Sequence, residues 1–264
     1  MAPNTIGFAL KALLPLFVTC GTIGALLLGI RGANAQDPAV KPGQTKGVVE
    51  LFTSQGCSSC PPADALFGKL AKRSDLLVLT MPVDYWDYLG WKDTLALPGN
   101  TARQKAYART RGDGQVYTPQ AVINGQIHAN GSNESSIENA LRKTATSPSI
   151  ALKGWGEKDA LVIEAASAAG ATPAQVQASK GSLFLAVVQR QAEVAIGRGE
   201  NHGRKITYSN VVRQLKPIGE WTGAAATFRV ARADIVREGA DFCAVVLQQG
   251  SSGPILAAAE IKMP

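Results

Sequence analysis

The stretch that decides the fold reads Gly47-Val-Val-Glu-Leu-Phe-Thr53, then Ser-Gln-Gly-Cys57-Ser-Ser-Cys60, then Pro-Pro62. Its first seven residues are β-branched, apolar and aromatic, which predicts a strand. The two prolines suit the first turn of a helix, where the missing amide costs no hydrogen bond. Apolar residues then recur at helical spacing. Two cysteines therefore lie between the end of a strand and the start of a helix.

The next elements follow in an order that predicts one α/β unit over residues 47–146. An apolar run predicts a buried strand, and Asn124-Gly125 predicts a tight hairpin. Ser135-Ser-Ile-Glu138 matches a capping box that opens a helix ending near Lys143. The remaining predicted elements are strands at Leu76–Val83, Val116–Ile123 and Gln126–Ala129 and a helix at Thr101–Arg111, with an irregular insertion at 84–116.

Past a Thr- and Ser-rich junction at 144–148, the pattern changes to strands and turns. Six or seven short strands with almost no helical period predict an all-β, sandwich-like domain over 149–264. The expected strands are Ser149–Lys153, Ala160–Ala166, Ser182–Gln191, Ala192–Ile196, Ala225–Val230, Phe242–Gln248 and Ile255–Lys262. We expect one long loop, at Gly197–Gly223.

The N-terminus predicts export. Lys11 precedes an apolar run that ends before Ala33 and Ala35, the small-x-small pattern of a signal-peptidase site. We expect a signal peptide over 1–35, a polar leader over 36–46 and a periplasmic or secreted protein, the alternative being an uncleaved anchor. No later segment is apolar enough to cross a membrane. Removing 35 of the 264 residues leaves 229, with three cysteines.

The Cys57–Cys60 pair carries the strongest chemical signal. A helix N-terminus stabilises a thiolate, which favours Cys57 as the attacking thiol and Cys60 as the resolving one. The alternatives are an inert disulfide and a soft-metal ligand pair for copper or zinc. Four-coordinate zinc needs a second ligand cluster, which the sequence lacks. No cofactor is expected beyond a redox-active disulfide.

Thr118-Pro119 is the second signal, because it stands at the start of a predicted strand. Proline cannot donate to a sheet ladder, so it prefers a strand start, an edge or a cis bond. Downstream of a redox pair, we favour a cis bond that leaves the preceding backbone free to pair with an extended peptide.

This order of elements resembles a thioredoxin fold, with Pro119 facing the cysteines. Within that superfamily, three segments are similar to the exported bacterial family DUF1223, which has no established function: Glu50–Asp64, Asp84–Asp93 with Val83, and Val116–Gln120. Gly199–Gly203 and Asn210–Arg213 extend the similarity into the second predicted domain. The resemblance implies a thiol–disulfide oxidoreductase that acts on exported protein thiols and disulfides or on a redox partner protein.

Two departures from thioredoxins concern the proton chemistry. Thioredoxins carry a buried acid six residues before the first cysteine and a tryptophan directly before it, where this chain has Leu51 and Gly56. The base for Cys60 is therefore open. Glu50 is adjacent but should point to the other face of its strand, and His128 could approach from the hairpin.

Residues 84–93 place four aromatic rings in ten positions. With Ser58, Ser59, Thr118 and Pro119, we expect Tyr85 and Trp86 to contact substrate as part of a peptide-binding wall. The alternative is that these rings only close the insertion over the core.

The rest of the chain adds weaker signals. Basic residues in 197–219 predict a solvated surface or a rim near the site. Cys243 reads as a core residue, and His202 as an exposed turn residue. No aromatic-interleaved basic patch or phosphate loop predicts nucleic-acid binding. The competing function is a non-catalytic envelope binding module.

Overall fold

A computed structural model describes residues 45, 47–144, 150–235 and 238–263. The predicted signal peptide, and the predicted leader apart from Thr45, lie outside the described residues. All described residues belong to one compact unit. Within them, the helices are all too short or too polar to span a membrane.

The predicted order of elements is largely confirmed. In the first half of the chain they are β1 (Gly47–Thr53), α1 (Pro61–Leu70), β2 (Leu76–Pro82), η1 (Asp87–Leu89), α2 (Pro98–Arg111), β3 (Gln120–Ile123), β4 (Ile127–Asn130) and α3 (Glu134–Lys143). In the second half they are β5 (Ile150–Gly156), β6 (Ala160–Ser167), α4 (Pro173–Ala178), β7 (Gly181–Ala195), β8 (Lys205–Trp221), β9 (Ala226–Ala231), η2 (Arg232–Asp234), β10 (Phe242–Gln248) and β11 (Ile255–Lys262).

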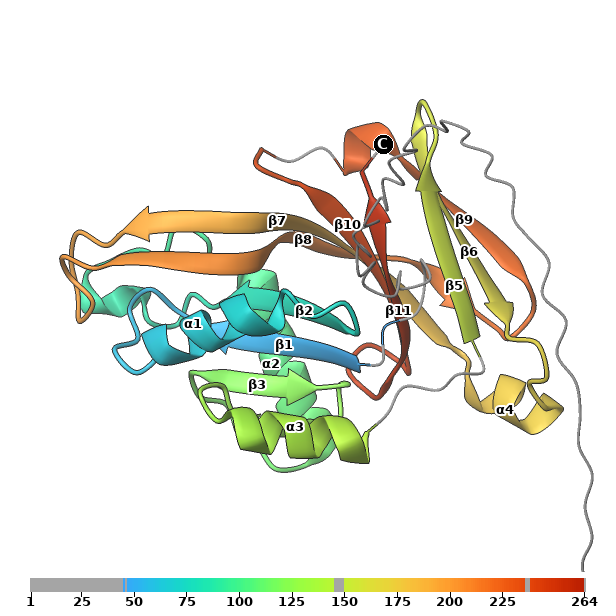
Figure 1. The fold of residues 1–264 in the computed structure, drawn as a ribbon, viewed down its shortest axis with the longest axis horizontal. Coiled ribbons are helices and arrows are strands. Elements are labelled where there is room, and N and C mark those ends of the chain that lie inside the picture. Colours follow the sequence, from blue (N-terminus) through green and yellow to red (C-terminus); the bar gives the residue numbers. More distant parts are fainter. Residues whose placement is uncertain (1–44, 46, 145–149, 236–237, 264) are drawn as a thin grey trace, which may run out of the picture. The chain divides into compact units, whose positions relative to one another are not determined.

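Eight strands form one mixed sheet in the order β11-β10-β7-β8-β2-β1-β3-β4, and β5, β6 and β9 form a separate antiparallel sheet (Figure 1). β1 pairs in parallel with β2 and antiparallel with β3. The parallel strand pairing between β2 and β8 covers one residue pair, Thr80 with Val211. The Thr80 hydroxyl donates to the Ser209 carbonyl at 2.6 Å, and the Asn210 side-chain Nδ2 donates to the Val78 carbonyl at 3.0 Å.

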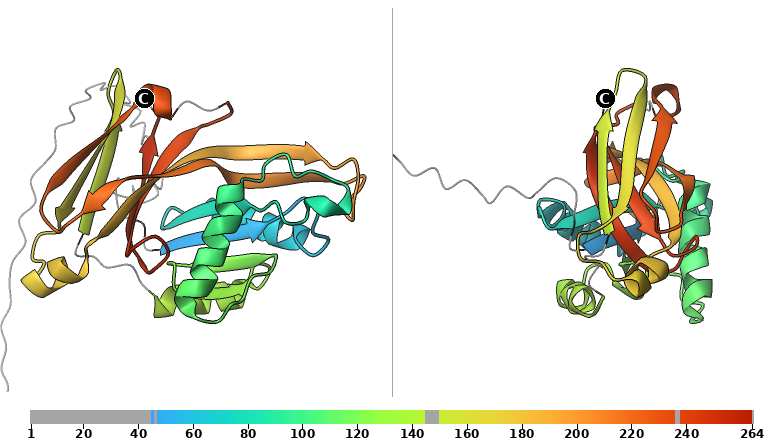
Figure 2. Two further views of the ribbon diagram at one scale, coloured as in Figure 1. Left: turned by 180° about the vertical axis from the view of Figure 1, so that it is seen from behind. Right: turned by 90° about the vertical axis from the view of Figure 1, so that its right-hand side faces the viewer.

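Alternate side chains of β1 face two different helix layers. Val49 and Leu51 pack with α1 and α3, whereas Val48 and Phe52 pack with Tyr107 of α2. Figures 1 and 2 show α1 and α3 on one face of this part of the sheet and α2 across the other. Burial on both faces explains why β1 and β2 are apolar almost throughout.

The two sheets pack on each other in the second half of the chain. β5, β6 and β9 share a buried apolar core with β7, β10 and β11. The opposite side of β7 and β10 belongs to the α2 core: Ala186, Val188 and Phe242 are buried in the same cluster as Val48 and Tyr107. The predicted junction at 144–148 therefore separates segments that share one core.

The expected loop at Gly197–Gly223 is wrong over most of its length, because Lys205–Trp221 is the strand β8. Likewise, Ser182–Gln191 and Ala192–Ile196 are parts of one strand, β7. The charged residues of β8 and Pro217 are more typical of loops than of strands, so the sequence pattern did not indicate a strand there. Pro217 stands where the register between β7 and β8 shifts, a bulge that tolerates a proline.

Three smaller expectations also differ. Asn133, not Ser135, caps α3, and its side chain accepts from the Ser136 amide. β3 begins at Gln120 instead of Val116, because the preceding segment bonds to side chains of α2 and β3. The short helix α4 follows a capping box at Thr172 that the sequence analysis did not identify.

Candidate functional site

Cys57 and Cys60 form a disulfide between the end of β1 and the start of α1, as expected from their position, with 5.4 Å between their Cα atoms. The Cys57 amide donates to the Ser54 carbonyl, and the Cys60 amide donates to the Cys57 carbonyl, both at 3.2 Å. Cys60 is the residue that caps α1. A tight turn thus delivers both sulfurs to the helix N-terminus.

Both cysteines are buried, with 1% of Cys57 and none of Cys60 exposed. In the disulfide form, the two residues are thus shielded almost equally. Ser58 and Ser59 are exposed. The Ser59 hydroxyl lies 3.4 Å from Cys57 Sγ and is the donor, because a disulfide sulfur carries no hydrogen.

The Thr118–Pro119 peptide bond is cis, as predicted. Pro119 is near the start of α1, since a Cβ built on Gly131 lies 3.1 Å from Pro119 Cβ and 3.2 Å from Ala63 Cβ. The Gly131 amide donates to the Pro119 carbonyl at 2.9 Å. These contacts hold the loop before β3 against the helix that begins at the cysteines.

Trp86 lies between the two arms of the site, which are the cysteine loop at 54–60 and the Thr118–Pro119 loop. Its indole Nε1 donates to Thr118 Oγ1 at 2.8 Å, and a Cβ built on Gly56 lies 3.0 Å from Trp86 Cβ. Tyr85 and Trp86 are half-buried and pack on the α2 core, whereas Tyr88 is 78% exposed. These two rings therefore close the insertion over the core while each keeps part of its surface exposed.

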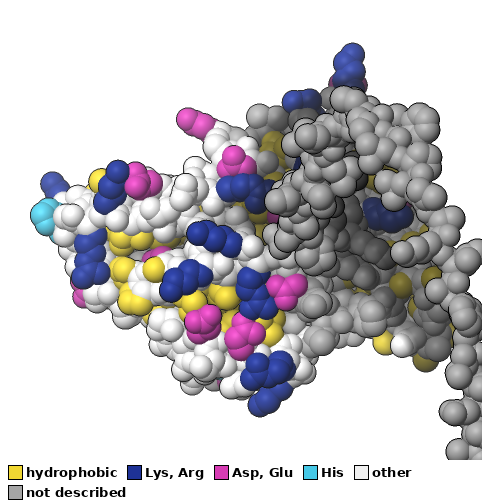
Figure 3. Space-filling view, in the orientation of Figure 1, with side chains coloured by type: hydrophobic (Ala, Val, Ile, Leu, Met, Phe, Trp, Pro, Cys, Tyr) yellow, Lys and Arg dark blue, Asp and Glu magenta, His cyan; other side chains and the backbone are white. Residues whose placement is uncertain are grey.

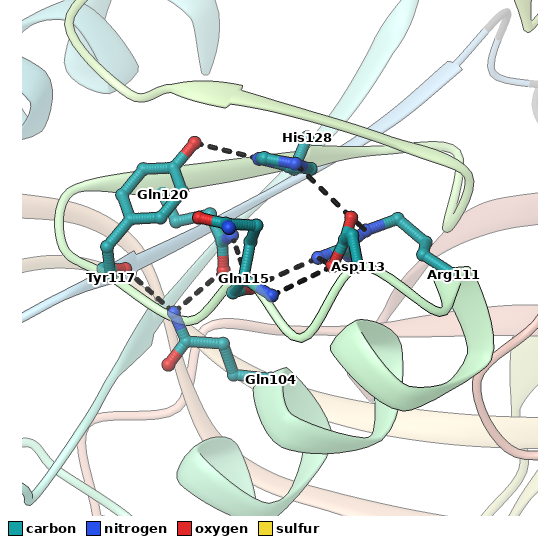
Figure 4. A network of polar contacts seen from close by, with 7 residues as sticks. All are labelled: Gln104, Arg111, Asp113, Gln115, Tyr117, Gln120 and His128. Carbon is teal, nitrogen blue, oxygen red and sulfur yellow. Dashed lines mark hydrogen bonds and ion pairs between the residues drawn. The ribbon is translucent and has the colours of Figure 1, made fainter.

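A polar network fixes the segment before Thr118 (Figure 4). Gln104 of α2 donates to the Tyr117 carbonyl and to Gln120 Oε1, both at 2.8 Å. The Tyr117 hydroxyl lies 2.8 Å from His128 Nδ1, and His128 Nε2 lies 3.3 Å from Asp113. Both ring nitrogens of His128 are engaged there, and burial lowers the pKa of the ring. The structure thus commits both ring nitrogens of His128 to this network and not to Cys60.

Glu50 lies on the α2 side of the sheet, as strand alternation predicts. Its carboxylate accepts from Arg103 Nε at 2.7 Å and from the Tyr107 hydroxyl, and all three side chains are buried. The Arg103 guanidinium stacks 4.8 Å from the centre of the Tyr107 ring. Glu50 therefore neutralises a buried cation on the face opposite α1.

Gln55 is a site residue that the sequence reasoning missed. It is fully buried. Its backbone amide donates to Asp93 Oδ2, and its side-chain Oε1 accepts from Trp91 Nε1, both at 2.8 Å. Asp93 also accepts from the Leu95 and Ala96 amides. Gln55 thereby ties the cysteine loop to the segment after η1.

The turn between β7 and β8 also reaches the cysteines. A rim near the site was one of two interpretations of residues 197–219, but Asn201 and Glu200 were not singled out. Asn201 is fully buried, and its Nδ2 donates to the carbonyls of Gln55 at 2.9 Å and Cys57 at 2.8 Å. Glu200 Oε2 accepts from the Ser58 amide at 3.2 Å. The signal for these two residues was their motif, Gly199–Gly203, but nothing in the sequence said which loop it would touch.

Two remaining expectations concern single residues. Cys243 is buried in β10 as a free thiol, as predicted, and burial raises its pKa to about 11. His202 is exposed, also as predicted. In the described ranges, no three His, Cys, Asp or Glu side chains are grouped closely enough to hold a metal ion.

A disulfide at the β1–α1 junction of a mixed sheet is compatible with a thioredoxin-like site. A cysteine pair placed in this way can support reversible two-electron exchange, either between its disulfide and external thiols or between its reduced form and an external disulfide. Asp64, one turn into α1, is a further buried acid that the sequence reasoning passed over.

Comparison with known proteins gives one family and two solved structures. A family model described as "Protein of unknown function (DUF1223)" matches residues 48–248. The crystal structure of protein AGR_C_4864 from Agrobacterium tumefaciens is 32% identical, with a TM-score of 0.71, over 84% of this chain and 96% of that chain. HBP35 of Porphyromonas gingivalis shares the fold at 11% identity and a TM-score of 0.54, over 83% of this chain and 76% of that chain. No curated protein matches this chain.

Proposed function

The chain belongs to the DUF1223 family, whose function is unknown, and on that premise we propose that it is an exported thiol–disulfide oxidoreductase. The observation that carries the proposal is the Cys57–Cys60 disulfide at the start of α1, next to the Thr118–Pro119 loop. Trp86 contacts both arms. A protein that only needed a cross-link would have no use for a second loop held against the same turn.

The fold assignment is part of the proposal. A thioredoxin-like domain is supported by the β1–α1–β2 unit, the β3–β4 hairpin, α3 and the cis bond before β3. A sandwich-like second domain is supported by the packing of β5, β6 and β9 on β7, β10 and β11. The long hairpin β7–β8 joins the two through β2.

In the reductive direction, the Cys57 thiolate attacks one sulfur of a substrate disulfide, and the other substrate sulfur leaves as a thiolate. Cys60 then attacks Cys57, which reforms the Cys57–Cys60 disulfide and releases the second substrate sulfur as a thiolate. The substrate gains two electrons, which the cysteine pair loses. The oxidative direction is the same sequence reversed.

The remaining roles are assigned by proximity to the pair. Ser59 and the amides at the start of α1 stabilise the Cys57 thiolate. Thr118 and Pro119 hold the substrate backbone, while Ser58, Tyr85 and Trp86 contact its side chains. The predicted signal peptide supports a periplasmic or secreted location, where substrates are exported protein thiols and disulfides or a redox partner protein.

A second candidate is a non-catalytic binding module with a structural disulfide or a copper or zinc ligand pair. The observation that favours it is the burial of both cysteines. An inert bridge is shielded in this way, whereas an exchanging one needs a path for the attacking thiol.

Trapping separates the two candidates. Cys60→Ser is made in a Cys243→Ser background, so that Cys57 is the one cysteine left once the signal peptide with Cys20 is cleaved. The variant is expressed with its export signal and resolved on non-reducing gels. We expect mixed disulfides that dithiothreitol removes, and none in the matched Cys57→Ser variant. Recovery of no mixed disulfide, or of stoichiometric copper or zinc that Cys57→Ser loses, would support the binding module.

A further inference from the structure

Asp64 places a carboxyl group one helical turn beyond Cys60. The Asp64 amide donates to the Cys60 carbonyl at 3.1 Å, and Cys60 has helical backbone angles (φ −78°, ψ −35°). Residues four apart share one helix face, with about 5–6 Å between their Cβ atoms. Because helical side chains lean back toward the N-terminus, the Asp64 carboxyl is directed to the Cys60 side of that face.

The carboxyl is held by one oxygen and free at the other. Thr53, buried at the end of β1, donates its hydroxyl to Asp64 Oδ1 at 2.8 Å. Asp64 Oδ2 is buried and has no hydrogen-bond partner among the described residues. A buried carboxylate oxygen without a donor is costly, so this oxygen is suited to carrying a proton.

The groups around Asp64 favour its neutral form. Burial raises its pKa to about 8; the Thr53 hydroxyl opposes this shift, and the negative charge of Asp93 adds to it. Tyr208 of β8 faces the same acids, and its pKa is raised by burial and by the charges of Asp64 and Asp93. A pKa near 8 is close to that of an ordinary thiol, about 8.5, so proton exchange between the two costs little.

A cavity beside Asp64 offers a route by which a proton on its carboxyl can reach solvent. It has a volume of about 540 Å³ and lies between α1 and β8, with Asp64, Gly68 and Ile206 among its walls and Lys69, Lys72 and Lys205 lining it as well. Figure 3 shows basic side chains gathered on this face of the molecule. Ser58 and Ser59, which we place against the substrate, are not among its lining residues, so a proton on Asp64 has a route that does not pass the substrate.

We propose that Asp64 accepts the proton of the Cys60 thiol when Cys60 closes the disulfide, an inference that rests on the proposed oxidoreductase function. In that step the Cys60 S–H bond breaks and its proton moves to Asp64. The Cys60 sulfur bonds to the Cys57 sulfur, and the bond between Cys57 and the substrate sulfur breaks. The substrate leaves as a thiolate with the electron pair. Asp64 then returns the proton to water through the cavity.

The other acids and bases near the pair have partners of their own, Glu200 among them, which accepts from the Ser58 amide. Glu50 lies on the opposite face of β1, paired with Arg103. His128 bonds to Tyr117 and Asp113. Asp93 accepts three backbone amides. Asp64 is the acid that shares a helix face with Cys60.

The test follows closure of a defined mixed disulfide. Cys57 of the reduced Cys243→Ser protein is joined to thionitrobenzoate in acid, where closure is slow, and the release of coloured thiolate is recorded after jumps to higher pH. We expect Asp64→Asn to slow release about 100-fold below pH 8, the lower end of the usual range for loss of a general base. The variant should converge with the parent at alkaline pH, where Cys60 ionises unaided. Glu164→Gln, an exposed carboxylate on β6, is the matched control and should keep the parent profile.

Two outcomes are kept apart. Equal pH profiles for the parent and Asp64→Asn, with a pair that opens and closes, would overturn only the assignment of Asp64. A parent pair that never closes would contradict the oxidoreductase function and the inference with it. Should Asp64→Asn fail to fold, carbon-13 NMR of the Asp64 carboxyl in the parent protein decides. Its titration midpoint should differ between the oxidised and reduced forms, and identical midpoints would overturn the proposal.

Discussion

The hydroxyl of Ser59 is 3.4 Å from Cys57 Sγ and donates to it. Such a donor stabilises a thiolate more than a thiol, because a hydrogen bond to a charged group is the stronger one. We expect Ser59→Ala to raise the pKa of the Cys57 thiol by about half a unit, a modest shift because Ser59 is exposed and water replaces part of the bond. Thiolate absorbance of the reduced protein measures the shift. Ser58→Ala is the matched control, and an equal rise in both variants would contradict this role.

Asp64 makes stability depend on pH in a direction that can be worked out. The pKa of the Asp64 carboxyl is about 8 in the folded protein, against 3.8 for an unperturbed aspartate. The folded state therefore binds this proton more tightly than the unfolded state does. The stabilisation is complete below about pH 4 and is lost as pH rises to about 8. Each pKa unit corresponds to about 1.4 kcal/mol, so the full window sets an upper limit of roughly 6 kcal/mol.

Asp64→Asn removes this titration. We expect the variant to match the parent near pH 4 and to exceed it near pH 8 by a few kcal/mol, within that limit. Urea unfolding across the range, with Glu164→Gln as the control, measures the difference. A parent and an Asn variant whose stabilities stay parallel over the whole range would contradict a raised pKa for Asp64.

At the residue scale, local chemistry was predictable and spatial neighbours were not. Cys57 and Cys60 could be identified from their spacing, and Pro119 from its place at a predicted strand start, where proline cannot donate a ladder hydrogen bond. Gln55, Asp64 and Asn201 are ordinary polar residues, and their roles depend on being buried beside the cysteines. Only a partner far along the chain, such as the Cys57 carbonyl for Asn201, reveals that role.

The β7–β8 hairpin is the element that distinguishes this site. Its turn holds the cysteine loop through Asn201 and Glu200, and Trp91 packs against Gly197 and Gly199 of the same turn. Because both cysteines are buried, we expect an attacking thiol to need the surrounding loops to move, this turn among them. Opening therefore breaks the Asn201 hydrogen bonds, each worth about 1 kcal/mol.

Asn201→Ala should therefore ease access to Cys57. We expect dithiothreitol to reduce the disulfide about tenfold faster in this variant, because the closed turn loses one to two kcal/mol. Asn210→Gly is the matched control: it also removes a buried amide of β8, bonded to Val78, and glycine tolerates the positive φ of 51° at that position. Faster reduction in both variants would point to general loosening instead of a gate.

At this scale the sequence predicted short elements well and the long hairpin poorly. β10 and β11 are mostly apolar runs, so their bounds were predicted to the residue. β8 carries charges on a half-exposed arm and a proline at a bulge, which together imitate a loop. Local pattern cannot report a strand whose hydrogen-bond partner supplies most of its stability.

Across the whole molecule, the two halves of the chain share one core. Phe52, Leu79 and Tyr107 lie in the same buried cluster as Val188 and Phe242. We expect a chain that ends at residue 146 to remain unfolded, because it exposes this cluster and the β2 edge that pairs with β8. Circular dichroism and urea titration of that fragment beside the full chain give the answer. Cooperative unfolding of the fragment would show that residues 47–146 fold alone.

The central claim is that Cys57–Cys60 exchanges with external thiols, and the redox equilibrium of the native pair tests it most directly. The Cys243→Ser protein is equilibrated in graded glutathione and dithiothreitol buffers, quenched by alkylation and weighed by mass spectrometry. We predict reversible two-electron reduction with a potential above about −300 mV. Structural disulfides typically have potentials below this value and resist reduction by the glutathione pool. A pair that stays oxidised until the protein unfolds would contradict the account.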